Sequence, residues 1–342
     1  MTVLYIAGEA ALAVVTPSNG EWKLDLPLID SQPQCLAVDP VHEEQIYCGT
    51  FDQGLWHSAD AGATWKHVGD GIPHNAATSV AVSQTEQMAG YGVVYAGTEP
   101  SAIFRSEDRG KSWVELAEVR RLPSAPTWSF PPRPWTSHIR WITPDPLVSG
   151  RIFAAAEAGA LIRSLNGGRT WEDRKPTGPF DTHTLVMHPL APDRLYSAAG
   201  DGFRRPGNGF VQSDDGGETW HRPDAGLDYN YLWSVAADPA DPDTLVTSAA
   251  PGPQQAHNPK SADSAIYRRS GGDPWRKVSE GLPGSRGMLA SVLASNKAEP
   301  NVFYAANNKG VFRSGDGGST WMEPPIRWTH LGRANALLAV QY

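Results

Sequence analysis

The string SDDGGETW, residues 213–220, recurs along this chain at nearly even intervals and decides its fold. The copies share a serine, an aspartate or asparagine at the third position, a glycine at the fifth, a hydroxyl residue at the seventh and a closing tryptophan. The full copies are SADAGATW (58–65), SEDRGKSW (106–113), SLNGGRTW (164–171), SDDGGETW (213–220) and SGDGGSTW (314–321). Two weaker copies end at Trp22 and Trp275.

The spacing of the closing tryptophans indicates a repeat architecture. Successive tryptophans are separated by 43, 48, 58, 49, 55 and 46 residues, which fits one four-stranded propeller blade per repeat with insertions in loops. Within each copy, the third residue is expected to accept a backbone N–H two residues on, and the glycine to supply a positive φ. The tryptophan then opens the next strand and buries its ring between blades. The string therefore predicts a turn and not a catalytic motif.

This pattern resembles the Asp-box, or BNR, repeat family, which includes sialidases, sortilin-type receptors and xyloglucanases. The resemblance covers the whole chain and implies a β-propeller. It is much less specific for function, because the family contains enzymes, receptors and assembly factors. In the family's enzymes the site lies at the axial mouth, on the face of the loops that join one blade to the next.

Strand patterns around the turns predict how the ring closes. The segments 34–40, 45–50, 54–58 and 64–68 read as four strands, a to d, of one blade. The first blade has only strands b, c and d, at 2–8, 11–16 and 21–26, whereas 334–342 is an apolar strand without later partners. The sequence therefore predicts an all-β fold: one domain, residues 1–342, forming a seven-bladed β-propeller in which the C-terminal strand joins blade one.

Strand alternation places the repeated turns on one face and the d–a and b–c loops on the other. This second face carries two insertions, 118–137 and 250–264, of which the first is proline-rich and expected to lack helix and strand. Aromatic and arginine side chains on such loops favour a ligand site at the mouth. The residues expected to bind the ligand are Arg140, Arg133, Trp135, Tyr231, Trp233 and Arg333.

Several chemistries stay open for this mouth. The expected catalytic residues are His183, Asp181, His138 and Glu157, with His183 as a general base oriented by Asp181 in a hydrolase or lyase. A glycosidase needs two carboxylates, and the candidates are Glu99, Glu157, Asp181, Asp201 and Asp228. Sialidases of the family carry an Arg-Ile-Pro string near the start and an arginine triad for the substrate carboxylate. Here the nearest string is Arg121-Leu122-Pro123, inside an insertion, so no sialidase residue is transferred.

Two further alternatives are a divalent transition-metal site and a non-catalytic scaffold. Histidines from different blades suit such a metal, the candidates being His74, His138, His183 and His330. A scaffold would instead bind a peptide across the mouth. The sequence favours a hydrolase- or lyase-like enzyme that acts on a small polar or anionic molecule or a carbohydrate.

Composition limits the partners and the compartment. The 342 residues carry a net charge of −8 and no basic run, which argues against nucleic acid and an anionic membrane as partners. The N-terminal segment lacks the basic start of a signal peptide. Cys35 and Cys48 are expected to be reduced core residues, and the protein to be cytoplasmic.

Overall fold

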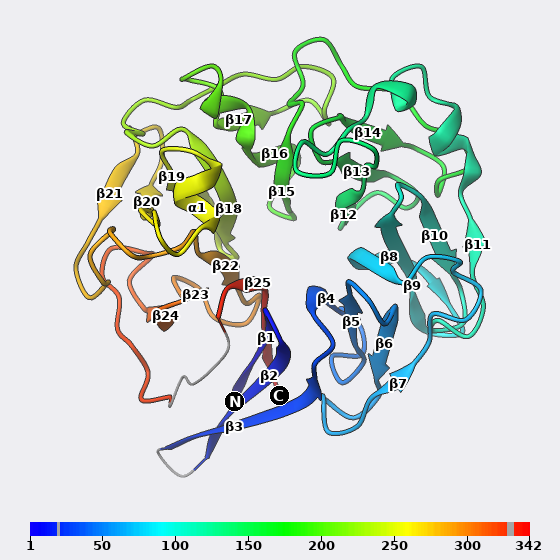
Figure 1. Ribbon diagram of the computed structural model, residues 1–342, viewed down its shortest axis with the longest axis horizontal. Coiled ribbons are helices and arrows are strands. Elements are labelled where there is room, and N and C mark those ends of the chain that lie inside the picture. Colours follow the sequence, from blue (N-terminus) through cyan, green and yellow to red (C-terminus); the bar gives the residue numbers. More distant parts are fainter. Residues whose placement is uncertain (19–20, 327–331) are drawn as a thin grey trace.

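A computed structural model describes residues 1–18, 21–326 and 332–342. The described residues form seven antiparallel sheets of three or four strands, arranged as a ring around a central axis (Figure 1). The predicted all-β, seven-bladed propeller is therefore confirmed. No helix in the described part of the chain is long and apolar enough to cross a bilayer.

The first three sheets have four strands each. Their strands are β25 (Ala334–Gln341), β1 (Thr2–Gly8), β2 (Ala11–Ser18) and β3 (Glu21–Ile29); β4 (Pro33–Val38), β5 (Ile46–Thr50), β6 (Leu55–Ser58) and β7 (Lys66–His67); and β8 (Ala76–Met88), β9 (Tyr91–Glu99), β10 (Ile103–Ser106) and β11 (Val114–Glu115). Strand β25 pairs antiparallel with β1, so the C-terminal strand completes the first blade as predicted.

The remaining four sheets complete the ring. Their strands are β12 (Ile139–Pro144), β13 (Ile152–Ala156) and β14 (Ala160–Ser164); β15 (Thr182–His188), β16 (Ala191–Ala199) and β17 (Phe210–Ser213); β18 (Tyr231–Asp238), β19 (Asp241–Ala250), β20 (Ala265–Arg269) and β21 (Arg276–Val278); and β22 (Val292–Ser295), β23 (Phe303–Asn307) and β24 (Gly310–Ser314). In the three-stranded sheets, an isolated bridge after the repeated turn, such as Arg163 with Glu172, stands in for the fourth strand.

The helices of the described residues are short and lie in the insertions and one blade loop. They are η1 (Ala117–Arg121), η2 (Ala125–Thr127), η3 (Gly200–Phe203) and α1 (Pro253–His257). The expectation that 118–137 contains no helix is wrong, because η1 and η2 form there. Helix η2 begins at Ala125-Pro126, and the fixed φ of proline suits the first turn of a helix, whose N–H groups have no intrahelical partners.

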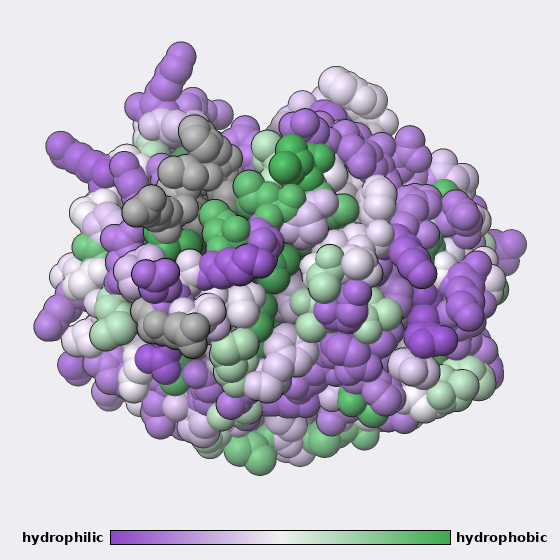
Figure 2. All heavy atoms as spheres, turned by 90° about the horizontal axis from the view of Figure 1, so that it is seen from below, coloured by the Kyte–Doolittle hydropathy of each residue, from purple (hydrophilic) through white to green (hydrophobic). Residues whose placement is uncertain are grey.

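Apolar side chains pack between neighbouring blades. One such cluster joins Leu4 and Ile6 of β1 to Val292 and Tyr304 of the preceding blade. The outer rim seen in Figure 2 is mainly hydrophilic, with apolar side chains interspersed. The apolar core therefore lies between neighbouring sheets.

The repeated turns are pinned by the same hydrogen bonds in each full copy. In the first, the amide of Gly62 donates to the Ser58 hydroxyl at 2.8 Å, and the amide of Thr64 donates to Asp60 Oδ1 at 2.8 Å. The aspartate thus accepts an N–H four residues on, and the predicted bond two residues on is wrong. Gly62 has a φ of 85°, as expected from its position. The turns lie on the face opposite the loops that follow strands β9, β13 and β16.

We expect the turn aspartates to make the free energy of unfolding depend on pH in the acid range. The Thr219 hydroxyl and amide donate to Asp215 and lower its pKa to about 2. A carboxylate with a lowered folded-state pKa stabilises the fold above its ordinary pKa, and this contribution is lost as the pH falls through the folded value.

The substitution D215N should therefore flatten the loss of stability between about pH 4 and pH 2. At neutral pH it should cost less than about 0.5 kcal/mol, because Asn166 makes the same bond to Thr170. Thermal unfolding followed across this pH range measures the effect, with D228N as control because Asp228 lies in no repeated turn. An unchanged pH profile for D215N would refute this account of the turn.

Candidate functional site

The innermost strand of most blades carries a β-bulge at its mouth end. The register of pairing shifts by one residue in β25, β4, β8, β12, β15 and β18. The residues skipped at these shifts are Asn335, Gln34, Thr78, Arg140, His183 and Trp233. A bulge redirects a side chain that regular alternation would place elsewhere. Each of these strands thus turns a polar or aromatic side chain toward the mouth.

Five of these side chains, all except that of His183, line an axial cavity of about 1450 Å³. It opens on the face of the d–a and b–c loops, which is the predicted face. The described lining contains eight Arg or Lys side chains and only five carboxylates, although the whole chain is acidic. The cationic residues are Arg133, Arg140, Arg174, Lys175, Arg204, Arg205, Arg222 and Arg333. The cavity therefore favours anions.

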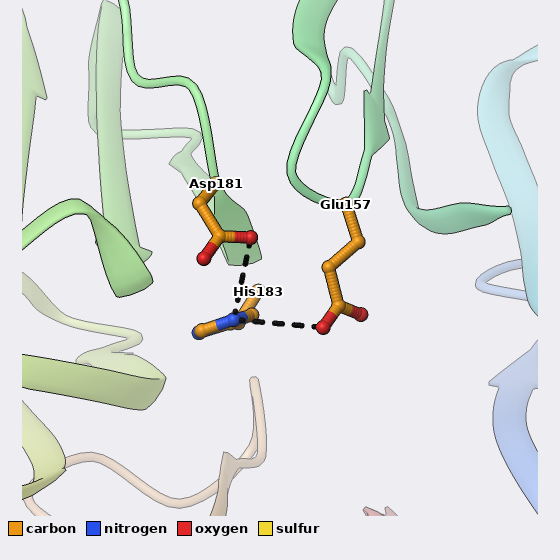
Figure 3. A group of neighbouring side chains, drawn as sticks. All are labelled: Glu157, Asp181 and His183. Atoms are coloured by element: carbon orange, nitrogen blue, oxygen red, sulfur yellow. Dashed lines mark ion pairs between the residues drawn. The ribbon is translucent and has the colours of Figure 1, made fainter. Parts of the chain in front are cut away.

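Glu157, Asp181 and His183 meet at the floor of the cavity and form what we call the polar centre (Figure 3). Glu157 follows β13, Asp181 precedes β15, and His183 lies within β15. The imidazole Nε2 of His183 is 3.6 Å from Asp181 Oδ1 and 3.8 Å from Glu157 Oε1. Both distances exceed a hydrogen bond, so the three groups face one another without direct bonding.

Each carboxylate of the polar centre has a partner that fixes its position. Glu157 Oε2 lies 2.8 Å from His138 Nε2 and 3.7 Å from Arg140 Nε. The amide of Ala158 donates to Asp181 Oδ1 at 2.9 Å. Since Glu157 uses Oε2 for His138, its Oε1 is left facing His183.

His183 is fully buried and its ring is held from two sides. Its Nδ1 lies 2.6 Å from the carbonyl of Leu232, and because a carbonyl only accepts, Nδ1 carries a proton. Its Nε2 lies 3.4 Å from the Tyr231 hydroxyl, which is also 3.1 Å from His257 Nε2. His183 therefore presents Nε2 to the polar centre.

Two arginines converge on one tryptophan beside the polar centre. The guanidinium carbons of Arg140 and Arg333 lie 4.5 Å and 5.0 Å from the centre of the Trp233 ring. Arg140 Nε is buried and has no hydrogen-bond partner. The hydrogen bonds and ion pairs found among the described residues include none to Arg333. The pair thus offers donors to a ligand.

The surroundings move several pKa values away from their ordinary ranges. Burial alone would raise the pKa of Glu157, but the charge and hydrogen bond of His138, with His183 and Arg140, hold it well below its usual value. Burial raises the pKa of Asp181, and the charge of Glu157 adds to this effect against the opposing charge of His183. Burial and the charge of Arg140 lower the pKa of Arg333. The polar centre thus combines an ionised carboxylate with one that holds its proton more tightly.

The structure brings most of the predicted site residues together. Asp181 and His183 are neighbours, although Asp181 lies just before β15 and the bulge at His183 interrupts the regular alternation on which the prediction rested. The residues His138, Glu157, Arg140, Tyr231, Trp233 and Arg333 surround them. Arg133 also lines the cavity, where its guanidinium donates to both oxygens of Glu99, at 2.9 and 2.6 Å. Phe130 and Phe51 stack against it.

Other predicted residues are not members of the polar centre, although Asp201 adjoins it. Trp135 is 80% exposed and does not line the cavity, and His74 contacts Phe104 instead. Asp228 is exposed, whereas Asp201 accepts the amides of Phe180 and Asp181. The metal candidate His330 lies outside the described residues.

The sequence analysis assigned no role in the site to His257 or Gly200. His257 ends helix α1 and packs against Trp233 with ring centres 4.3 Å apart. The Gly-Pro pair at 252–253, typical of a helix start, was the available signal. Gly200 leaves no room for a side chain, since a Cβ there would lie 2.1 Å from Asp181 Oδ2. Both residues therefore belong to the site.

Comparisons with known proteins find similarity in fold to proteins of different functions. No family model matches the chain. An oligoxyloglucan-reducing end-specific xyloglucanase from Emericella nidulans is 34% identical over 80 residues, which are 23% of this chain and 10% of that protein.

Two solved structures cover nearly the whole chain. A GH74 enzyme from Niastella koreensis matches 94% of this chain and 52% of its own, with a TM-score of 0.69 and 17% identity. YCF48 bound to a D1 peptide matches 95% of this chain and 97% of its own, with a TM-score of 0.61 and 16% identity. The chain thus spans about half of the GH74 structure, and at this identity the likeness shows the fold alone: a seven-bladed β-propeller.

Proposed function

We propose that the axial cavity is the active site of a carbohydrate-active enzyme, which cleaves a glycosidic bond of an anionic sugar by hydrolysis or elimination. The observation that carries this proposal is the polar centre at the floor of a cationic cavity. Buried ionisable groups that converge in a large cavity are typical of catalytic sites, especially where some of their donors and acceptors have no partner within the protein.

The size and lining of the cavity support a carbohydrate. A space of about 1450 Å³ accommodates several sugar rings. Phe180 and Phe203 lie in the lining and are 39% and 52% exposed, so their rings are available to stack on sugars. The local similarity to a xyloglucanase and the fold of a GH74 enzyme agree with this class of substrate.

The arginine pair at Trp233 supports an acidic sugar. Guanidinium groups bind carboxylates through paired hydrogen bonds, and Arg140 has a buried Nε without a partner. A sugar carboxylate held by Arg140 and Arg333 would bring the neighbouring glycosidic bond close to Glu157 and Asp181, which line the cavity. His183 lies beneath these carboxylates and is fully buried, so we assign it to the floor and not to substrate contact.

Two wider proposals concern the family and the compartment of the protein. The hydrogen bonds shared by the repeated turns support membership of the Asp-box, or BNR, repeat family. The thiols of Cys35 and Cys48 are free and buried, which agrees with a reducing compartment such as the cytoplasm. Fractionation of cells that express the protein tests the second point.

Product analysis tests the proposed activity. The purified protein is incubated with oligosaccharides of neutral sugars and of uronic acids, and the masses of the products are measured by mass spectrometry. Products that have gained one water show hydrolysis, and unsaturated products show elimination. Either result on uronic-acid oligosaccharides supports the proposal, whereas intact oligosaccharides throughout would overturn it.

A peptide-binding scaffold is the second candidate, because the fold matches YCF48 bound to a D1 peptide over 97% of that chain. In that case an acidic peptide would occupy the cationic mouth. Binding of acidic peptides without any cleavage of sugars would favour this candidate.

We expect R140Q to weaken binding of an acidic sugar selectively. Loss of a charge-assisted hydrogen bond of about 1.5–3 kcal/mol lowers affinity about 10- to 100-fold. Calorimetric titration with a galacturonate oligosaccharide and the matching galactose oligosaccharide measures the effect, and only the acidic sugar should lose affinity. R276Q is the control, because Arg276 is 79% exposed and lies outside the cavity. Equal losses for both sugars would refute recognition of the carboxylate by Arg140.

A further inference from the structure

We propose that Glu157, Asp181 and His183 bind one divalent transition-metal ion, of the Mn²⁺ or Zn²⁺ class. This proposal does not depend on the proposed activity, because metal binding is measured without a sugar. One atom from each of the three side chains lies within 4.8 Å of the other two. Figure 3 shows that the two carboxylates approach the imidazole from different loops.

The spacing of these atoms fits ligands of a shared ion better than hydrogen bonds. Ligands about 2.1 Å from one metal lie about 3.0–3.4 Å apart, depending on the coordination geometry. His183 Nε2 lies 3.6 Å from Asp181 Oδ1 and 3.8 Å from Glu157 Oε1. A contraction of a few tenths of an ångström would therefore bring His183 Nε2 and each carboxylate oxygen to the spacing of shared ligands, and the two carboxylate oxygens already lie within 4.8 Å of each other.

A second observation points independently to a ligand between these groups. The Glu157 side chain is nine-tenths buried, yet its Oε1 has no hydrogen-bond partner among the described residues and faces His183. Glu157 also lines the axial cavity, so this oxygen is accessible to an ion that enters the cavity. A cation at this point would supply the missing interaction and balance the charges of the two carboxylates.

The groups behind the three side chains complete the pattern of a metal site. A ligating histidine usually donates its other ring N–H to a carbonyl, and its ligating partners are themselves hydrogen-bonded. His183 Nδ1 donates to the Leu232 carbonyl, His138 holds Glu157 Oε2, and Ala158 donates to Asp181. Each proposed ligand thus has an orienting partner outside the centre.

The donor set selects the class of metal. Carboxylate oxygens suit Mg²⁺, Ca²⁺ and Mn²⁺, whereas imidazole suits Zn²⁺ and other transition metals. Two carboxylates with one imidazole are therefore best matched by Mn²⁺ or Zn²⁺. This assignment differs from the histidine set expected from the sequence: of those four residues it keeps only His183, His74 lies elsewhere, and His138 supports Glu157.

Metal analysis of the intact protein tests the proposal. The protein is stripped with a chelator, and MnCl₂ and ZnCl₂ are titrated into it by calorimetry, with Mn²⁺ binding also followed by the loss of the free-ion electron paramagnetic resonance signal. We expect one ion per chain for the unmodified protein. The variants E157Q, D181N and H183A should each bind at least about tenfold more weakly.

Two controls keep the result specific. H74A removes a histidine outside the cavity and D228N removes an exposed acid, and both should bind the ion normally. Circular dichroism checks that each variant is folded, and the isosteric D181N and E157Q serve if H183A is not. Absence of Mn²⁺ and Zn²⁺ binding to the unmodified protein would overturn the proposal. The proposal would also be overturned if E157Q, D181N and H183A all bound the ion as tightly as the unmodified protein. A metal bound without any sugar cleavage would support this site and count against the proposed activity alone.

Discussion

The substitution G200A is expected to reduce sugar binding and turnover at least about 100-fold while leaving the propeller folded. A Cβ at Gly200 would lie 2.1 Å from Asp181 Oδ2 and 2.9 Å from His183 Cε1. Since Asp181 Oδ2 is the far end of a side chain, the carboxylate can move aside. That movement breaks the 2.9 Å bond from Ala158 and displaces the carboxylate from the polar centre. A displacement of about 1 Å at a reacting group costs about 100-fold in rate.

The matched control for this prediction is G272A, because a Cβ at Gly272 would have no atom within 4 Å. G272A should bind and act normally. The cost of G200A in unfolding free energy should be about 1–3 kcal/mol, which urea titration measures. If G200A retains full sugar affinity, the polar centre does not contribute to the site.

The substitution D238A is expected to lower the free energy of unfolding by about 2–4 kcal/mol. Asp238 is 1% exposed at the end of β18, and it joins two blades. Its Oδ1 accepts the amide of Ala240 at 2.8 Å in its own blade, and its Oδ2 accepts the amide of Asn301 at 2.6 Å in the next. Alanine would leave both amides without this partner.

The midpoint of urea unfolding measures this loss. D238N keeps one carbonyl acceptor and should fall between D238A and the unmodified protein. D228A, at an exposed aspartate, should change stability by less than about 0.5 kcal/mol. If D238A and D228A unfold alike, Asp238 does not connect the blades.

A second aspartate, Asp39, also accepts backbone amides from two neighbouring blades, and the short string that marks both aspartates is visible in the sequence. Asp39 accepts the amides of Val41 and, from the next blade, Gly92, each at 2.9 Å. Both aspartates precede a proline at the end of an innermost strand. The Asp-Pro string was visible in the strand patterns, but its partner in the next blade depends on long-range packing.

The repeated turns made the ring and its closure predictable, because each turn is a local structure with its own hydrogen bonds. The register of the innermost strands was not predictable to one residue. The bulges at Arg140, His183 and Trp233 place an extra residue in the strand, and no local signal in the sequence marks them. Alternation alone therefore identified the right strands and left the exact direction of each side chain open.

The directions of the side chains in the insertions were harder to predict, because these side chains contact residues that are distant in the sequence. Arg133 was expected at the mouth and is held there by Glu99. Trp135, two residues later, is turned outward. Likewise His257 reaches the cavity only because helix α1 packs beside β18 and β19. Composition predicted a loop rich in arginine and aromatic residues and did not distinguish which of them face the axis.

The crystal structure of the protein with a uronic-acid oligosaccharide would test the central claim most directly. The account predicts electron density for the sugar in the axial cavity, with its carboxylate between Arg140 and Arg333 and its ring above Glu157 and Asp181. Sugar bound on the face of the repeated turns would contradict it. So would an empty cavity in crystals grown at a sugar concentration that saturates the protein in solution.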